Sequence, residues 1–404
     1  MGIADVATRQ IAIGKQSGLG TLAATNAGKL YNHRPASAGG LNKEAFESNS
    51  IRPDRQFGNP RHGLRSGLFT LDQELQIGGH NDLFAAALNA AWAVNATTGP
   101  ISNVTAAASP PQFTRATGSF LTDGFRVGDM VRWTGWLTTA TGNNNRNFFI
   151  TAVTATQITG IFLDGTAVAP KAAGDSVTCS VPGRRLQIPA SGHTKDYFTI
   201  DDWHSDAPSN MRIKDAIVSS VAFDITPNGI ATVAFNFVGI DGTPGTAQYF
   251  SAPAASPTGP YLAGPNGRIW WNGNISAVMS GMQLTLDTAA EVKPVIGANV
   301  SPDVFRGGNR ITGSFSALFD GNALITPFDT EQEAPLALVL TADGSAASDF
   351  LIIKLPNVKL NSMSKAADGP AYTVSADFSG GRYVGSNGAL EGTSIVLIDS
   401  TVSA

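Results

Sequence analysis

The sequence is poor in cysteine and in charge, and both shortages narrow the classes of protein it can encode. Cys179 is the only cysteine among 404 residues, so no intrachain disulfide can staple the fold. Charged residues make up 14% of the chain, well below the usual level, and Ala, Thr, Ser, Asn and 44 Gly fill the difference. The net charge of −4 argues against the clustered basic surface that tight nucleic-acid binding requires. Such a neutral, polar surface favours a protein that packs against copies of itself.

Targeting and cofactor signals are also missing from the sequence. The N-terminal stretch MGIADVATRQIAIGKQSG has no apolar core long enough for a signal peptide, and no stretch approaches a membrane span. We therefore expect synthesis in the cytoplasm. The chain has no GxxxxGK[ST] loop, no complete GxGxxG and no histidines at ligand spacing, so we expect no cofactor and no metal.

Most of the chain is typical of β-strands, because runs rich in Val, Ile, Thr and Phe alternate with Gly, Asn, Asp and Pro. The segment 68–77 alternates strictly. Its buried side is predicted to carry Phe69, Leu71, Leu75 and Ile77, and its wet side Thr70, Asp72, Glu74 and Gln76. A helix is predicted after it, with Asn81 or Asp82 as N-cap. A second, short helix is expected around residues 330–340.

Two stretches of the chain follow the same pattern. Residues 213–229 align without a gap on residues 353–369, at an offset of 353 − 213 = 140. After the turn the offset increases by one, so that Phe237 aligns with Phe378, as a changed hairpin loop would produce. Upstream, Gly67 and Phe69 align with Gly313 and Phe315. Two unrelated β-hairpins could look alike at this level, but the ordered series of matches favours a duplicated β-domain.

A segment of different composition interrupts the first copy. From about residue 99 to residue 183 the chain becomes rich in Thr, Ala and Asn, with short strands between turn signals. We expect a small all-β module inserted in a loop, because loop insertions cost little free energy. The predicted domains are 1–98 (first part of repeat 1), 99–190 (insert), 191–257 (remainder of repeat 1 and linker) and 258–404 (repeat 2).

The stretch DDWHSD, residues 201–206, is the densest group of reactive side chains. In an extended segment Asp202, His204 and Asp206 would share one face, which could hold a metal weakly. A polar strand end is the favoured interpretation, because catalytic groups seldom assemble from consecutive residues. The paired tryptophans Trp133/Trp136 and Trp270/Trp271 fit a barrel core or an interface better than a sugar site. A basic loop is a further candidate site, and it is either solvated or reaches a neighbouring subunit. Its basic residues are Arg52, Arg55, Arg61 and Arg65.

Several stretches together resemble the major tail tube proteins of long-tailed bacteriophages. They are IGKQSGLGTLAATNAGKLY, LNKEAFESNSIRPDRQ, GLFTLDQELQIGGHNDLFAAALNAAW and YFTIDDWHSDAPSNMRIKDAIVSSVAFDITPNGIATVAFNFVGID. The insert's FLTDGFRVGDMVRWTGW also resembles a small β-module found inserted in such proteins. The resemblance spans most of residues 1–245 and, less closely, residues 260–404.

The resemblance implies a mainly β (α+β) fold with one or two short helices, in which tandem sandwich or barrel repeats contribute strands to an oligomeric inner β-barrel. It implies a structural virion protein, not an enzyme, that stacks in rings around a tape measure protein, meets tail terminator and distal tail proteins, and lets double-stranded DNA pass. The duplication favours a trimeric, pseudo-hexameric ring over a hexamer. Along residues 232–237, Thr232, Ala234 and Asn236 are predicted to alternate with buried Val233, Phe235 and Phe237. The residues expected to face the lumen are Asp72, Glu74, Thr232, Asn236, Thr373, Ser375 and Asp377.

Two other classes remain open from the sequence alone. A surface β-module protein for carbohydrate binding or adhesion would use the tryptophan pairs, and an enzyme would be centred on residues 201–206. The missing signal peptide and disulfides disfavour the first class.

Overall fold

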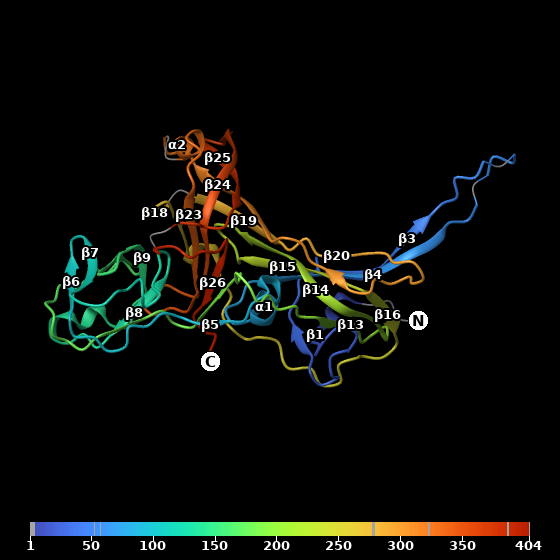
Figure 1. The fold of residues 1–404 in the computed structure, drawn as a ribbon, viewed down its shortest axis with the longest axis horizontal. Helices are drawn as coiled ribbons and strands as arrows, with labels where there is room; N and C mark the ends of the chain where they lie inside the picture. Colours follow the sequence, from blue (N-terminus) through green and yellow to red (C-terminus); the bar gives the residue numbers. More distant parts are fainter. Residues whose placement is uncertain are drawn as a thin grey trace.

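Two long strands, β14 (Ser209–Ile225) and β24 (Phe350–Asp368), organise the fold of the computed structural model (Figure 1). The structure describes residues 5–51, 53–56, 58–276, 279–321, 324–385 and 388–403. Each long strand carries a β-bulge: between Ile213 and Ala216, β14 advances three residues while its neighbour advances two, and β24 does the same between Leu355 and Val358. Because a bulge bends a strand, the two halves of each long strand join different sheets.

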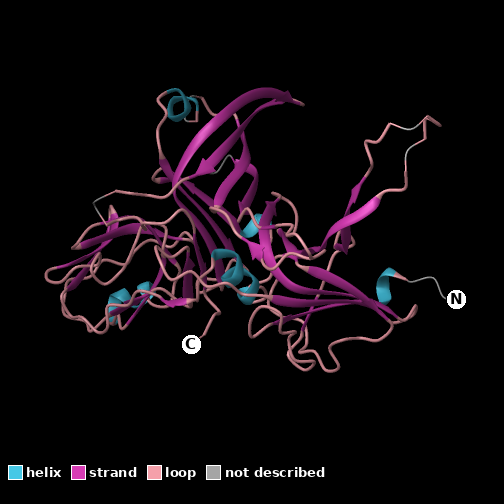
Figure 2. Cartoon of the chain, turned by 45° about the vertical axis from the view of Figure 1, so that its right-hand side comes forward, coloured by secondary structure: helices cyan, strands magenta, loops and turns pink. Residues whose placement is uncertain are grey.

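The second halves of the long strands belong to one continuous antiparallel sheet (Figure 2). In spatial order its strands are β3 (Ala38–Phe46), β4 (Arg61–Glu74), β15 (Thr232–Gly239), β14, β19 (Met279–Asp287), β22 (Arg310–Leu318), β25 (Ala371–Gly380) and β24. Within the described residues, no strand pairs with the outer edge of β3 or with the outer edge of β24 over residues 359–368.

The first halves of the long strands are covered by further strands. Around β14 lie β2 (Lys29–Tyr31), β1 (Arg9–Lys15), β13 (Phe198–His204) and β16 (Asp241–Gly245). Around β24 lie β18 (Asn274–Ser276), β17 (Gly267–Trp271), β23 (Ala334–Thr341) and β26 (Val396–Asp399), extended by β12 (Arg184–Gln187) and β5 (Ala93–Val94). A short ribbon pairs β20 (Glu291–Val292) with β21 (Val304–Phe305).

The mainly β class is confirmed, and the helices in the described part of the chain are short. They are α1 (Asn81–Leu88), α2 (Ile325–Asp329) and the 3₁₀ turns Val6–Thr8, Thr138–Asn143 and Gly264–Asn266. The predicted helix around 330–340 is wrong: α2 ends at Asp329 and residues 334–341 form a strand, because Pro335 and the run of apolar side chains suit a buried sheet. No helix in the described part of the chain is long and apolar enough to span a membrane.

Helix α1 closes the core behind the continuous sheet. Phe84 packs on Phe223 and Phe235 with ring centroids 5.7 and 5.3 Å apart. The N-cap is His80, not Asn81 or Asp82, and its side chain caps nothing. Its ring instead lies buried between Phe84 and Phe235, where Nε2 accepts a hydrogen bond from the Gln76 backbone N–H at 3.3 Å. Accepting this bond requires the neutral imidazole.

The strand connectivity of the first half recurs in the second. The series β1, β2, β3, β4, α1, β13, β14, β15, β16 corresponds to β17, β18, β19, β22, α2, β23, β24, β25, β26, with the same antiparallel neighbours at each step. The bulges place Ile213 on Leu355, so the offset in the long strands is 355 − 213 = 142 and not 140. The strand pairs likewise place Gly67 on Ile311 and not on Gly313, at an offset of 311 − 67 = 244. A two-residue shift leaves every side chain on its predicted face.

Residues 104–180 form a separate antiparallel sheet. Its order is β11 (Thr178–Ser180), β8 (Met130–Thr134), β9 (Phe148–Val153), β10 (Gln157–Phe162), β7 (Pro111–Arg115) and β6 (Val104–Ala108). The sheet has its own aromatic core, in which Trp133 lies 4.5 Å from Phe113 between ring centroids. This core is continuous with Trp270 and Phe350 of the second half of the chain, and β12 pairs with β26 there.

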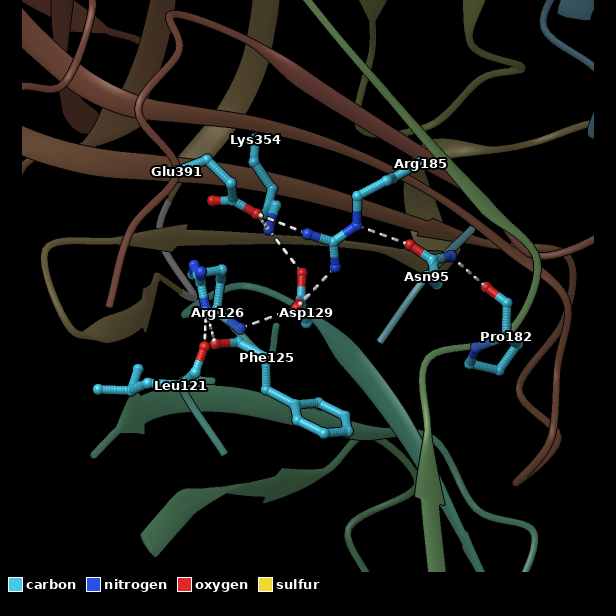
Figure 3. Close-up of polar contacts among 9 residues, drawn as sticks. All are labelled: Asn95, Leu121, Phe125, Arg126, Asp129, Pro182, Arg185, Lys354 and Glu391. Carbon is cyan, nitrogen blue, oxygen red and sulfur yellow. Dashed lines mark hydrogen bonds and ion pairs between the residues drawn. The ribbon is translucent and has the colours of Figure 1, made fainter. Parts of the chain in front are cut away.

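A buried charge cluster joins this small sheet to β24 (Figure 3). Lys354 Nζ lies 2.6 Å from Asp129 Oδ1 and also bonds Glu391, while Arg185 reaches Asp129 Oδ2 at 3.2 Å. Burial would raise the pKa of Asp129, but the charges of Lys354 and Arg185 outweigh it and hold the pKa below its ordinary value. The ion cluster therefore stabilises the fold above the ordinary pKa of an aspartate, and this stabilisation is lost as the pH falls through the lower folded value.

We expect Lys354→Met to destabilise the chain by about 3–5 kcal/mol, because it leaves buried carboxylates without their nearest cation. Guanidinium-induced unfolding measures this change. The matched control is Lys15→Met, which removes an exposed pair with Asp196 and should cost at most about 1 kcal/mol. Equal costs for the two variants would contradict a stabilising role for the cluster.

A second prediction concerns His80, whose pKa full burial lowers to about 4. The unfolded chain binds a proton near pH 6.5 and the folded chain does not, so stability should fall by about 3 kcal/mol between pH 6.5 and 4. Thermal unfolding measured across this range should show a weaker dependence of stability on pH in His80→Gln than in the wild type. The control His193→Gln alters an exposed ring and should leave the wild-type slope in place.

Candidate functional site

One face of the continuous sheet is polar along its whole width. In β15 the residues Val233, Phe235 and Phe237 are buried, whereas Thr232 and Asn236 are only half-buried, which confirms the predicted alternation. The polar face is defined here as the side of the sheet that carries Asn236 and Asp377. Its small and polar side chains come from both halves of the chain. Cross-strand pairing sets these side chains opposite one another on neighbouring strands.

Asn236 and Asp377 occupy equivalent places on the polar face. Asn236 accepts a hydrogen bond from Thr70 Oγ1 at 2.7 Å and donates one to Ser220 Oγ at 2.9 Å. Asp377 accepts from Ser362 Oγ at 2.7 Å, and 362 − 220 = 142 is the offset of the long strands. The same position is thus neutral in the first half and charged in the second.

Further acidic residues lie on the polar face. Asp224 pairs with Thr232, which in turn pairs with Glu74. Asp287 pairs with Ser220 on one side and with Arg310 on the other. Asp224 and Asp287 were missed in the sequence, although the alternation of Ser220, Ala222 and Asp224 along β14 carries the signal.

The predicted face residues differ in exposure. Ser375 and Asp377 are exposed, and Glu74, Thr232, Asn236 and Thr373 are half-buried. Asp72 is only 8% exposed and lies 3.2 Å from an Arg34 guanidinium nitrogen. Residues 34–37 cover it because Arg34 N–H and Ser37 Oγ both donate to the Asp72 carbonyl.

The basic loop forms the far end of a hairpin between β3 and β4 that projects from the body (Figure 1). Arg55 and Arg61 are exposed. Arg65 is instead tied to its own chain by an ion pair of 2.9 Å to Asp241 and a hydrogen bond to the Gly242 carbonyl. Arg52 lies outside the described residues.

The stretch 201–206 forms the end of β13 and the following turn. Asp201 is buried and accepts from Asn210 and the Tyr249 backbone, while Asp202 pairs with Arg9 at 2.7 Å. His204 Nε2 lies 4.0 Å from Asp202. Among the described residues, no three His, Cys, Asp or Glu side chains gather so that they could hold a metal ion.

The four candidate stacking tryptophans are buried and cannot lie against a sugar. Trp133 and Trp136 are at most 1% exposed, and Trp270 and Trp271 at most 7%. Cys179 is also fully buried, and burial raises the pKa of its thiol. These residues serve the core, which leaves the polar face and its two unpaired edges as the functional surface.

Comparison with known proteins agrees with this geometry. A family model described as phage tail tube protein matches residues 7–381, nearly the whole chain. A search of curated proteins finds none that matches. The resemblance seen in the sequence is thereby confirmed: the chain belongs to the phage tail tube protein family, whose members are structural parts of the virion tail.

Proposed function

We propose that three chains close their continuous sheets into one β-barrel ring, and that stacked rings form the conduit for DNA ejection. The observation that carries this proposal is the pair of unpaired edges, on β3 and on β24, at opposite ends of an otherwise continuous sheet. An open sheet exposes backbone N–H and C=O groups that pairing with another chain satisfies. The role requires no catalysis.

The dimensions of such a ring suit its cargo. Three chains with eight strands each give 24 strands. At a spacing of about 4.8 Å and a tilt of about 40°, the backbone diameter is roughly 48 Å, which leaves a lumen of about 35–40 Å. A DNA duplex passes through such an opening. A hexamer of the same chain would double the strand number, which favours the trimer.

The polar face supplies the chemistry that a conduit needs. Glu74, Asp224 and Asp377 repel phosphate, and the small Ser and Thr side chains between them offer no platform on which bases could stack. We propose that this face lines the lumen. The tube would assemble around a tape measure protein and end at tail terminator and distal tail proteins.

The repeated connectivity supports a division of the chain into domains. We propose that 1–98 and 191–257 form one ring position and that 258–404 form the next; within residues 99–190, the separate sheet over 104–180 is an outward module. The insert follows α1, on the side of the sheet opposite the polar face. The adhesin alternative loses its support because the tryptophans it would use are buried.

The oligomeric state is the most direct test. Electron microscopy and mass measurement of the purified full-length chain should show rings or tubes with three chains per ring. A chain that remains monomeric at high concentration would contradict the proposal, and six chains per ring would contradict the trimer alone.

Charge reversal tests the lumen assignment. The double variant Asp224→Lys and Asp377→Lys should form tubes normally, because both side chains are exposed, but virions that carry it should eject DNA more slowly. The control Asp343→Lys reverses an exposed charge in the loop between β23 and β24. Unchanged ejection by the double variant would contradict a lumen position for these residues.

A further inference from the structure

The chain contains one complete contact between its two repeats. The strand part pairs Ser220–Ile225 of β14 with Met282–Asp287 of β19 in antiparallel register. The loop part places residues 293–303, the tip beyond the β20–β21 ribbon, against the first repeat. Within the proposed ring of three chains, the same neighbour relation would recur from the second repeat of one chain to the first repeat of the next.

The loop part is held by polar bonds and by a small apolar cluster. Asp303 bonds Lys195 Nζ at 2.6 Å and accepts from the Tyr197 hydroxyl at 2.9 Å. The Arg65 backbone N–H donates to the Asn299 carbonyl at 2.8 Å. Behind them, Tyr197, Ile217, Ile240 and Val304 form a buried cluster, with Val292 and Val300 packed against it.

Pairing identifies the first-repeat counterpart of this loop. Phe46 pairs with Arg61 at the far end of the β3–β4 hairpin, as Glu291 pairs with Phe305 in the ribbon. The offsets between these pairs are 291 − 46 = 245 and 305 − 61 = 244. The same two offsets relate equivalent positions of the continuous sheet, since Leu41 corresponds to Leu286 and Gly67 to Ile311. The end of the hairpin between Phe46 and Arg61 therefore corresponds to residues 292–304, which include the docked loop.

Pairing also identifies the surface that would receive the tip. Phe198 and Ala334 hold the same place beside the two bulges, at an offset of 334 − 198 = 136. Lys195 and Tyr197 thus correspond to Glu331 and Glu333. Glu331 is 75% exposed in its side chain although it pairs with Lys359, and Glu333 is exposed.

The chemistry of the contact is reversed at these counterparts. Inside the chain, the basic Lys195 on the receiving surface meets the acidic Asp303 at the end of the loop. On the free surface Glu331 and Glu333 are acidic, and the free hairpin carries Arg55 and Arg61 on either side of Asn59, the counterpart of Asp303. Ile217 belongs to the apolar cluster and Val292 packs against that cluster. Their counterparts are Lys359 and Glu47, which are again of opposite charge.

We propose that the β3–β4 hairpin of one chain docks on the second repeat of the neighbouring chain at Glu331 and Glu333, in the way residues 293–303 dock within the chain. This inference rests on the proposed ring and names its contact residues. A polar, charge-complementary contact stays hydrated in the free subunit and closes only on assembly, whereas the apolar internal copy is permanently buried.

The internal strand pairing also gives the register between chains. Ala222 pairs with Thr285 within the chain, and the two offsets convert this pair to 222 + 142 = 364 and 285 − 245 = 40. Ser364 of one chain should therefore lie opposite Gly40 of the next. A Cβ at Gly40 meets no atom within 4 Å, so a cysteine fits there.

The first experiment is disulfide cross-linking of assembled full-length protein. Ser364→Cys combined with Gly40→Cys should form covalent dimers and closed trimers under mild oxidation, while native Cys179 stays buried and unreactive. The matched control pairs Ser364→Cys with Leu41→Cys, whose side chain points to the opposite face and should not cross-link. Rings in which the control links and the Gly40 pair does not would overturn the register.

The second experiment exchanges charges. Glu331→Arg with Glu333→Arg should raise the concentration needed for assembly by about tenfold or more, and adding Arg55→Glu with Arg61→Glu should restore it. Asp343→Arg serves as a control that reverses one exposed charge outside the contact, and unfolding midpoints verify that each variant folds. If the variant with Glu331→Arg and Glu333→Arg assembles normally while the cysteines at positions 364 and 40 still cross-link, the docking proposal is overturned but the ring is not. Absence of any ring from the wild-type chain would overturn the proposed function itself.

Discussion

The pairing of β14 with β19 is the constraint on which the rest of the molecule depends. In the order of strands across the sheet, β14 is the last strand of the first repeat and β19 is the first strand of the second. Their pairing makes two four-stranded units into one sheet. Without it the polar face would be divided and each repeat would expose one more edge. Covalent linkage through residues 246–263 keeps the two repeats at high effective concentration, so this junction forms within the chain before any junction between chains.

The bulges in β14 and β24 solve a second problem, because one strand must serve both the continuous sheet and the outer layer. Asp215, next to the first bulge, has a φ of 53°, and its carboxylate accepts from the Gly20 backbone N–H at 2.6 Å. A non-glycine residue in this conformation is strained, and the hydrogen bond helps to hold it. The bend lets core side chains such as Ile213 and Phe223, on either side of it, both reach the layer containing α1.

Much of the architecture was accessible from the sequence, because alternation and turn residues are local signals. The buried faces of 68–77 and of β15 and the position of α1 were predicted for this reason. The repeat offset was in error by two residues because a bulge leaves the hydrophobic pattern almost unchanged. Asp72 was expected to be exposed; it is buried because Arg34, thirty-eight residues earlier, folds over it, and no local pattern reports such a contact.

The attachment of residues 104–180 bears on how the fold accommodates an added domain. The chain leaves the first repeat through β5 and returns through β12, and these two strands pair with each other, with Val94 opposite Arg184. The departure and return points are therefore about one strand spacing apart, near 4.8 Å. At the equivalent place in the second repeat, the chain passes from Asp329 to Ala334 with no added domain. Such a site accepts an insertion of almost any length without moving the strands on either side of it, so one repeat can gain a domain while the connectivity of both repeats is preserved.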